Sequence, residues 1–168
     1  MSRYYSGESS FRRVRRIAIG AMPATGADWS VSVPAGRLWE IVSITASLAT
    51  SGVANNREVD LTFTDGSTFF LVLPPAGLQA ASLSRDYTWF PGASDLALGL
   101  SISQPMPEMH LSAGYVIAPV TVNLDAGDIW EAPTLWIVET SVRGGDEDLD
   151  EAPEMVVEIY GGPAPSQS

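Results

Sequence analysis

Apolar and polar residues alternate with a period of two along most of the chain, a pattern typical of β-strands that bury one face. Gly, Pro and Asp residues that favour turns separate these stretches. The expected strands span residues 12–19, 29–33, 37–49, 58–64, 68–73, 83–90, 96–102, 120–124, 135–138 and 155–159. No helical stripe is longer than two turns. This organisation predicts an all-β fold, either a jelly roll or a related two-sheet antiparallel β-sandwich with an extended N-terminal arm.

The most regular of these stretches is the range 37–49. Its even-numbered residues are apolar, with Glu40 as the single misfit, and its later odd-numbered residues are mainly Ser and Thr. We therefore expect Leu38 and Val42 to face the core. Trp39 falls on the more polar face, so we expect it to be a surface aromatic residue.

The length of 168 residues predicts one domain with terminal extensions. We expect a basic N-terminal arm and linker over residues 1–28, a β-sandwich domain over residues 29–160 and a flexible C-terminal tail over residues 161–168. The chain has no apolar run of the length that a membrane span needs. It also has no apolar segment near its start that would serve as a standard signal peptide. We therefore expect no membrane partner.

The inventory of reactive side chains is small. The chain has no cysteine, no lysine and one histidine, which removes thiol and lysine nucleophiles and any multi-histidine metal centre. As a general base His110 would need an orienting carboxylate, and the neighbouring Glu108 would point to the opposite side of a strand. The acidic run 146–151 begins like a calcium loop, but Glu151 stands where an EF-hand requires glycine, so a solvated loop is favoured and calcium binding stays open. We expect no catalytic residue, no cofactor and no metal site.

The net charge of −11 is divided unevenly along the chain. Residues 1–16 hold five arginines and one glutamate, a net charge of +4. Residues 17–168 hold four arginines and 19 acidic residues, a net charge of −15. An acidic body would be repelled by phosphate, so this distribution argues against nucleic acid as the main partner and favours an acidic protein surface.

The arginines of the basic arm are the expected partner-binding residues, namely Arg3, Arg12, Arg13, Arg15 and Arg16. At strand spacing, Arg13 and Arg15 point to one side. Arg12 and Arg16 point to the other. Because guanidinium groups pair with carboxylates, we expect this arm to dock on acidic residues of neighbouring subunits. We also expect deletion of residues 1–16 to leave the fold intact.

Several segments resemble small β-rich virion proteins of tailed bacteriophages. The resemblance is carried by residues 33–48, 56–61, 64–66 and 124–129, and loosely covers residues 29–160. It implies a jelly-roll or related sandwich that serves as a head decoration (cement) protein, or as a head–tail or tail component, with no catalytic residue. The implied partners are the major capsid protein or other virion proteins. The implied location is the virion, assembled in the bacterial host cytoplasm.

We also expect the protein to self-associate, and we consider two other classes of function. The apolar run 135–138 suits a strand covered on both faces, which favours a homodimer or homotrimer. The alternative function is a tail, receptor-binding or carbohydrate-binding module that uses a surface tryptophan such as Trp39. The third class, a small β-sandwich hydrolase, lacks a recognisable nucleophile and base in the sequence.

Overall fold

The structure is a computed structural model that describes residues 11–142 and 156–159. These residues form strands and loops without a helix, so none of them forms an apolar helix long enough to cross a bilayer. The larger sheet contains β1 (Phe11–Ile19), β3 (Arg37–Ala49), β6 (Ser84–Phe90), β7 (Leu96–Leu98), β8 (Ser101–Pro105), β9 (Met109–Ser112), β11 (Ile129–Trp130), β12 (Thr134–Val142) and β13 (Val156–Ile159). The smaller sheet contains β2 (Val31–Ser32), β4 (Glu58–Thr64), β5 (Phe69–Leu73) and β10 (Val116–Val122).

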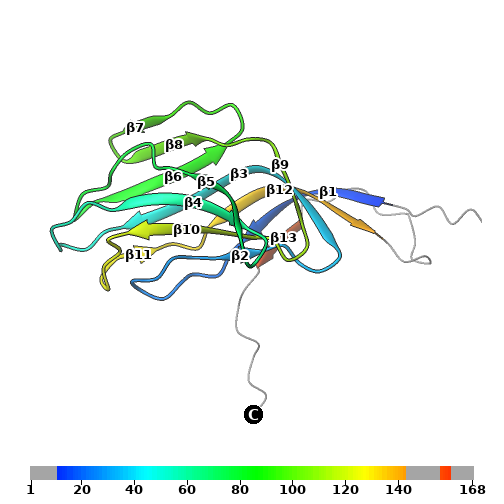
Figure 1. The fold of residues 1–168 in the computed structure, drawn as a ribbon, viewed down its shortest axis with the longest axis horizontal. Helices are drawn as coiled ribbons and strands as arrows, with labels where there is room; N and C mark the ends of the chain where they lie inside the picture. Colours follow the sequence, from blue (N-terminus) through cyan, green and yellow to red (C-terminus); the bar gives the residue numbers. More distant parts are fainter. Residues whose placement is uncertain (1–10, 143–155, 160–168) are drawn as a thin grey trace, which may run out of the picture.

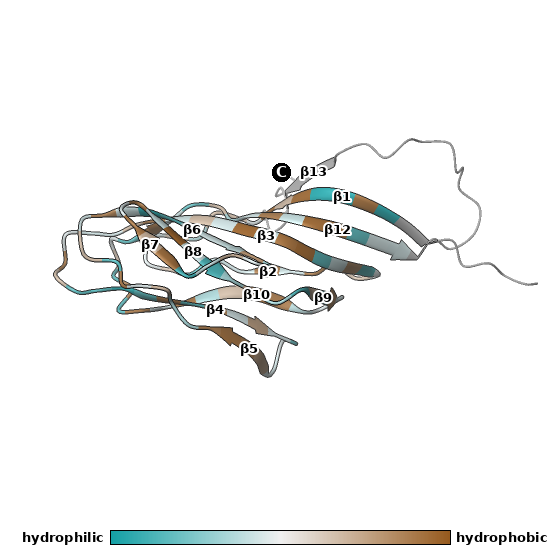
Figure 2. Cartoon of the chain, turned by 90° about the horizontal axis from the view of Figure 1, so that it is seen from above, coloured by the Kyte–Doolittle hydropathy of each residue, from teal (hydrophilic) through white to brown (hydrophobic). Residues whose placement is uncertain are grey.

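The two sheets are layered around a shared hydrophobic core (Figures 1 and 2). The larger sheet has the order β13-β1-β12-β3-β6-β8-β7, with β9 and β11 also paired to β3. The smaller sheet has the order β2-β10-β4-β5. The all-β, two-sheet prediction is confirmed. The purely antiparallel expectation is wrong for the larger sheet, because β1 pairs with β13 and β6 pairs with β8 in parallel.

Aromatic side chains fill the centre of the core. Trp130 meets Trp29 edge to face, with ring centroids 6.4 Å apart, and Tyr87 stacks on Trp89 at 5.6 Å. The polar ends of two buried rings are satisfied, since the Tyr87 hydroxyl donates a hydrogen bond to Gln79 and Trp89 Nε1 donates one to a second glutamine. Satisfied polar tips allow these large rings to be buried without the cost of a lost hydrogen bond.

A β-bulge in β3 changes which residues of the strand face the core, from odd-numbered residues before the bulge to even-numbered residues after it. Consecutive residues of β12 pair with Ser43 and then Ile41, so Val42 is an extra residue in β3. The expectations for this strand are therefore wrong over its first half. Trp39 is fully buried, whereas Leu38 and Val42 are exposed, Val42 by 44%. Beyond the bulge the even-numbered residues face the core, as the alternation predicts.

The basic segment expected in a separate arm forms part of the larger sheet. Strand β1 lies between β12 and β13 and pairs with β12 along all nine of its residues. Val14 and Ala18 on this strand are buried. Deletion of residues 1–16 would remove six of the nine residues of β1, so the structure does not support the expectation that this deletion leaves the fold intact. Residues 1–10 of the expected arm and the expected tail over residues 161–168 lie outside the described residues.

Candidate functional site

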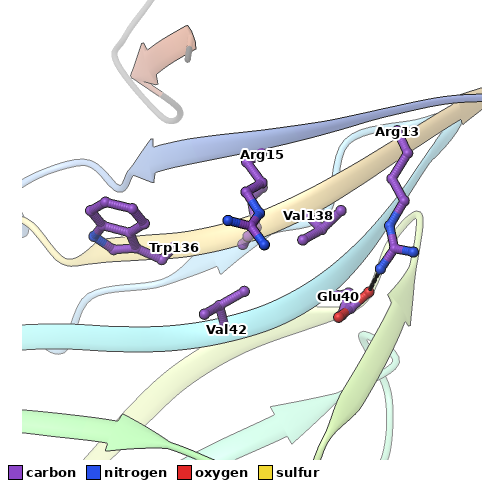
Figure 3. Close-up of a pocket in the computed structure, with 7 residues that line it drawn as sticks. Arg13, Arg15, Glu40, Val42, Trp136 and Val138 are labelled. Carbon is purple, nitrogen blue, oxygen red and sulfur yellow. Dashed lines mark hydrogen bonds and ion pairs between the residues drawn. The ribbon is translucent and has the colours of Figure 1, made fainter. Parts of the chain in front are cut away.

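A hollow on the outer face of the larger sheet combines arginine and tryptophan side chains (Figure 3). It has a volume of about 760 Å³ and crosses β1, β12 and β3. Its lining residues are Arg13, Arg15, Glu40, Val42, Trp136, Ile137 and Val138. We call it the arginine–tryptophan hollow.

Strand alternation places the arginines of β1 on this face. Arg13 and Arg15 point outward, whereas Val14 between them is buried. The prediction that Arg13 and Arg15 share one side, with Arg16 on the other, is confirmed. The side chains of Arg3 and Arg12 lie outside the described residues.

The aromatic part of the hollow comes from β12. Leu135 and Ile137 are buried, so Trp136 between them points outward and is 47% exposed. Within the single chain Trp136 is therefore uncovered, and the expectation that a second copy covers this face of residues 135–138 stays a prediction. Beside it, Val42 extends the apolar surface because of the β3 bulge. Tryptophan and arginine are the side chains most enriched at the energetic centres of protein interfaces.

The charges in the hollow are only partly paired with each other. The Arg13 guanidinium donates a hydrogen bond to the Glu40 carboxylate, and the Arg13 side chain is 63% exposed. Arg15 forms no ion pair with the described residues. An exposed pair of this kind contributes little to stability because water and salt screen it. The guanidinium of Arg13 can therefore exchange Glu40 for a carboxylate of a partner.

An ionic cluster around the buried Glu139 supports the hollow from the inner side of the sheet. Glu139, which follows the hollow residue Val138 on β12, is buried and accepts a hydrogen bond of 2.9 Å from Trp39 Nε1. Its carboxylate also pairs with Arg37 at 3.1 Å and with Arg16 at 3.4 Å. Trp39 is thus not a surface aromatic residue, and Arg16 does not join Arg13 on the outer face.

The remaining candidate residues are not assembled into a reactive site in the described part of the chain. His110 on β9 is exposed, with Nε2 3.7 Å from Glu40 Oε2, at the rim of the same outer face. No group of three or more His, Cys, Asp or Glu residues that could hold a metal ion is present among the described residues. The acidic run 146–151 lies outside them.

Trp136 is the exposed tryptophan that the sequence pattern did not reveal. The run 135–138 is wholly apolar, so it carries no alternation that would mark one residue as outward-facing. No protein-family model, curated protein or solved structure matches the chain. The hollow itself is therefore the guide to function.

Proposed function

We propose that the protein is a non-enzymatic structural protein that attaches to an acidic surface of another protein. In the setting implied by the resemblance to phage virion proteins, it is a capsid decoration (cement) protein bound to the outer shell. The observation that carries the proposal is that Arg13 and Arg15 line the same hollow as the exposed Trp136, with Arg15 lying between Trp136 and Arg13 (Figure 3). A row of two guanidinium groups that ends at an exposed tryptophan suits a segment that offers carboxylates next to apolar side chains.

A protein partner fits the charges better than nucleic acid does. The net charge of −11 repels a polyanion at long range, and the hollow itself holds only two arginines against Glu40. An acidic segment of a shell protein needs contact only at the hollow. Many copies on a symmetric shell would then add weak contacts into stable attachment.

The strand order supports the proposal of a jelly roll. Four neighbouring strands of the larger sheet have the order β1-β12-β3-β6 and pair antiparallel throughout. The smaller sheet has the order β2-β10-β4-β5 and is also antiparallel. Along the chain these eight strands pass back and forth between the two sheets, as two Greek keys require. The two parallel pairs join β13 to β1 and β8 to β6, so they lie at the two ends of the four-strand order of the larger sheet.

The test combines detection in particles with binding by variants. Mass spectrometry of tailed phage particles purified from a culture that expresses the protein should find it in the virion. Purified particles that lack the protein should then bind the wild type in a salt-sensitive manner, because partly exposed ion pairs are screened within about 10 Å at 0.1 M salt.

The matched variants change the charge of the hollow in opposite directions. The double variant Arg13→Ser with Arg15→Ser should weaken attachment by about tenfold or more, since it removes two charge-assisted contacts. Glu40→Gln should strengthen it, because Arg13 then no longer pairs with an internal carboxylate. Attachment of the double variant with wild-type affinity and wild-type salt dependence would contradict the proposal.

The alternative of a carbohydrate-binding tail module now depends on another residue. Its expected surface aromatic, Trp39, is buried, and the exposed tryptophan is Trp136. A glycan array separates the two functions. Glycan binding that is lost in Trp136→Ala and insensitive to salt would favour the alternative, because sugar stacking on an aromatic ring does not depend on charge.

A further inference from the structure

One lateral side of the sandwich is apolar and is formed by the last strand of each sheet. Strand β5 ends the order of the smaller sheet, and β7 ends that of the larger sheet. The two edges are close in space, since the Gln104 side chain on β8 donates a hydrogen bond to the Pro74 carbonyl after β5, and Gly77 lies against Ala97 on β7. Both strands are coloured as hydrophobic in Figure 2.

Large apolar side chains are exposed along this side by 46% to 65%. They are Phe69, Phe70, Val72, Leu78, Leu96, Leu98 and Leu100, and we call them the apolar side. A phenylalanine side chain buries about 150–250 Å² when it is fully covered, so a large apolar side chain that is about half exposed offers roughly 90 Å², and the seven together offer roughly 600 Å². That area is at the upper end of what a monomer exposes in one patch, and patches of this size mark interaction sites.

Charge is absent from the segments that build this side. Residues 66–84 and 96–107 contain no Asp, Glu, Arg, Lys or His, although the chain carries a net charge of −11. Two copies of such an acidic chain repel each other over most of their surfaces. The apolar side is a surface at which two copies can approach without placing like charges against each other.

The edge of β5 carries neither a charged residue nor a proline within Phe69–Leu73, two of the features that protect an exposed strand from pairing. A bulge at Phe70 interrupts its register with β4, and among the described strands β5 pairs only with β4. Edge strands without such features pair readily with another strand. An identical strand is the simplest partner, because antiparallel pairing of two β5 strands satisfies a two-fold axis.

We infer that the apolar side is the contact surface of a homodimer, in which β5 of one copy pairs antiparallel with β5 of a second copy and the β7 leucines complete the interface. A standard interface buries about 800 Å² per partner, which the apolar side with its adjoining backbone can supply. The dimer goes beyond the proposed attachment to a shell and does not depend on it, since the arginine–tryptophan hollow lies on the outer face of the larger sheet.

The experiment is sedimentation equilibrium of the full chain from 1 to 100 µM (roughly the range that resolves micromolar dissociation constants). The wild type should have twice the monomer mass. Phe69→Glu and Leu98→Glu change outward positions on β5 and β7. Each should raise the dimer dissociation constant by at least about 100-fold, because it buries a negative charge in an interface that also contains the same charge from the second copy. The matched control is Met22→Glu, which makes the same change at a residue that is 63% exposed in the loop between β1 and β2 and should leave the dimer intact.

Every outcome bears on the inference. A wild type that stays monomeric at 100 µM would overturn it, as would a larger closed oligomer or a dimer that survives either substitution unchanged. Phe69→Ser and Leu98→Ser, with unfolding curves recorded for every variant, keep the test valid if a glutamate disturbs the fold.

Added salt should tighten the dimer or leave it unchanged, because salt screens the repulsion between two acidic chains. Attachment through the hollow should weaken with salt, so failure of one proposal is distinguishable from failure of the other.

Discussion

Arginine has opposite roles at the two ends of the central strand β3. Beyond the end at Ala49, Arg57 is fully buried and its guanidinium forms two hydrogen bonds, of 2.8 and 2.9 Å, with the Asp128 carboxylate. Near the end at Arg37, Arg13 pairs with Glu40 on the solvent-exposed face. An arginine–carboxylate pair therefore joins two loops at one end of β3, whereas at the other end such a pair is exposed and its arginine can change partners.

Complete pairing explains why the buried charges at the first end are tolerated. The third nitrogen of the Arg57 guanidinium, Nη1, donates to backbone carbonyls of the loop over residues 53–55. Asp128 also accepts hydrogen bonds from the backbone N–H groups of Ser51, at 2.7 Å, and Asp125, at 2.8 Å. A buried ion pair without such additional bonds would not repay its desolvation. This network ties the loop after β3 to the turn before β11.

Breaking the buried pair gives the largest effect that we expect. Arg57→Met keeps much of the side-chain volume but leaves Asp128 buried without its counter-ion, and it should lower the free energy of unfolding by about 3–5 kcal/mol. Urea unfolding followed by tryptophan fluorescence measures the loss. Arg13→Met is the matched control at the exposed pair and should change stability by less than about 0.5 kcal/mol. Equal losses of unfolding free energy in the two variants would contradict the claim that only the buried pair stabilises the fold.

The second expected effect is a loss of stability in acid that originates at Asp128. Burial alone would raise the pKa of Asp128, but hydrogen bonds from Arg57 and from the backbone of Asp125 and Ser51 outweigh it and lower the pKa to about 2. A depressed pKa in the folded state stabilises the fold above the unfolded-state pKa, and this stability disappears as the pH falls through the folded-state pKa. Because the pKa falls from the ordinary aspartate value of 3.8 to about 2, the contribution to the free energy of unfolding is about 2 kcal/mol, lost between roughly pH 5 and pH 2.

Unfolding measured from pH 6 to pH 2 in the wild type and in Asp128→Asn isolates this contribution. The variant should be less stable at pH 6 and should lose less stability on acidification than the wild type does. Carboxylates that do not contact Asp128, such as Asp65, contribute equally to both proteins and cancel in the difference. Identical pH dependence in the two proteins would show that the buried pair is not the source.

The sequence predicts local periodicity well and long-range pairing poorly. The all-β class and the placement of Arg13 and Arg15 on one side of their strand follow from the period of two, which is a local property. The burial of Arg57 depends on Asp128, 71 residues away along the chain, which no local pattern reveals. The reversal at Trp39 depends on one extra residue in β3, and a bulge is visible only in the pairing with β12.

The smallest effect that we expect concerns the support beneath the arginine–tryptophan hollow. Trp39→Phe keeps a six-membered aromatic ring in the core but removes the pyrrole part of the indole, including the Nε1 donor that lies 2.9 Å from Glu139. The carboxylate keeps its contacts with Arg16 and Arg37, so the lost hydrogen bond should cost about 1 kcal/mol, and the space left by the smaller ring adds to this loss. Trp136→Phe, at the exposed tryptophan, is the matched control and should leave stability unchanged within about 0.5 kcal/mol. A loss of stability in Trp136→Phe and none in Trp39→Phe would contradict the assignment of Trp39 as buried and Trp136 as exposed. Trp39→Phe should also weaken attachment slightly, because Glu139 follows the hollow residue Val138 on β12.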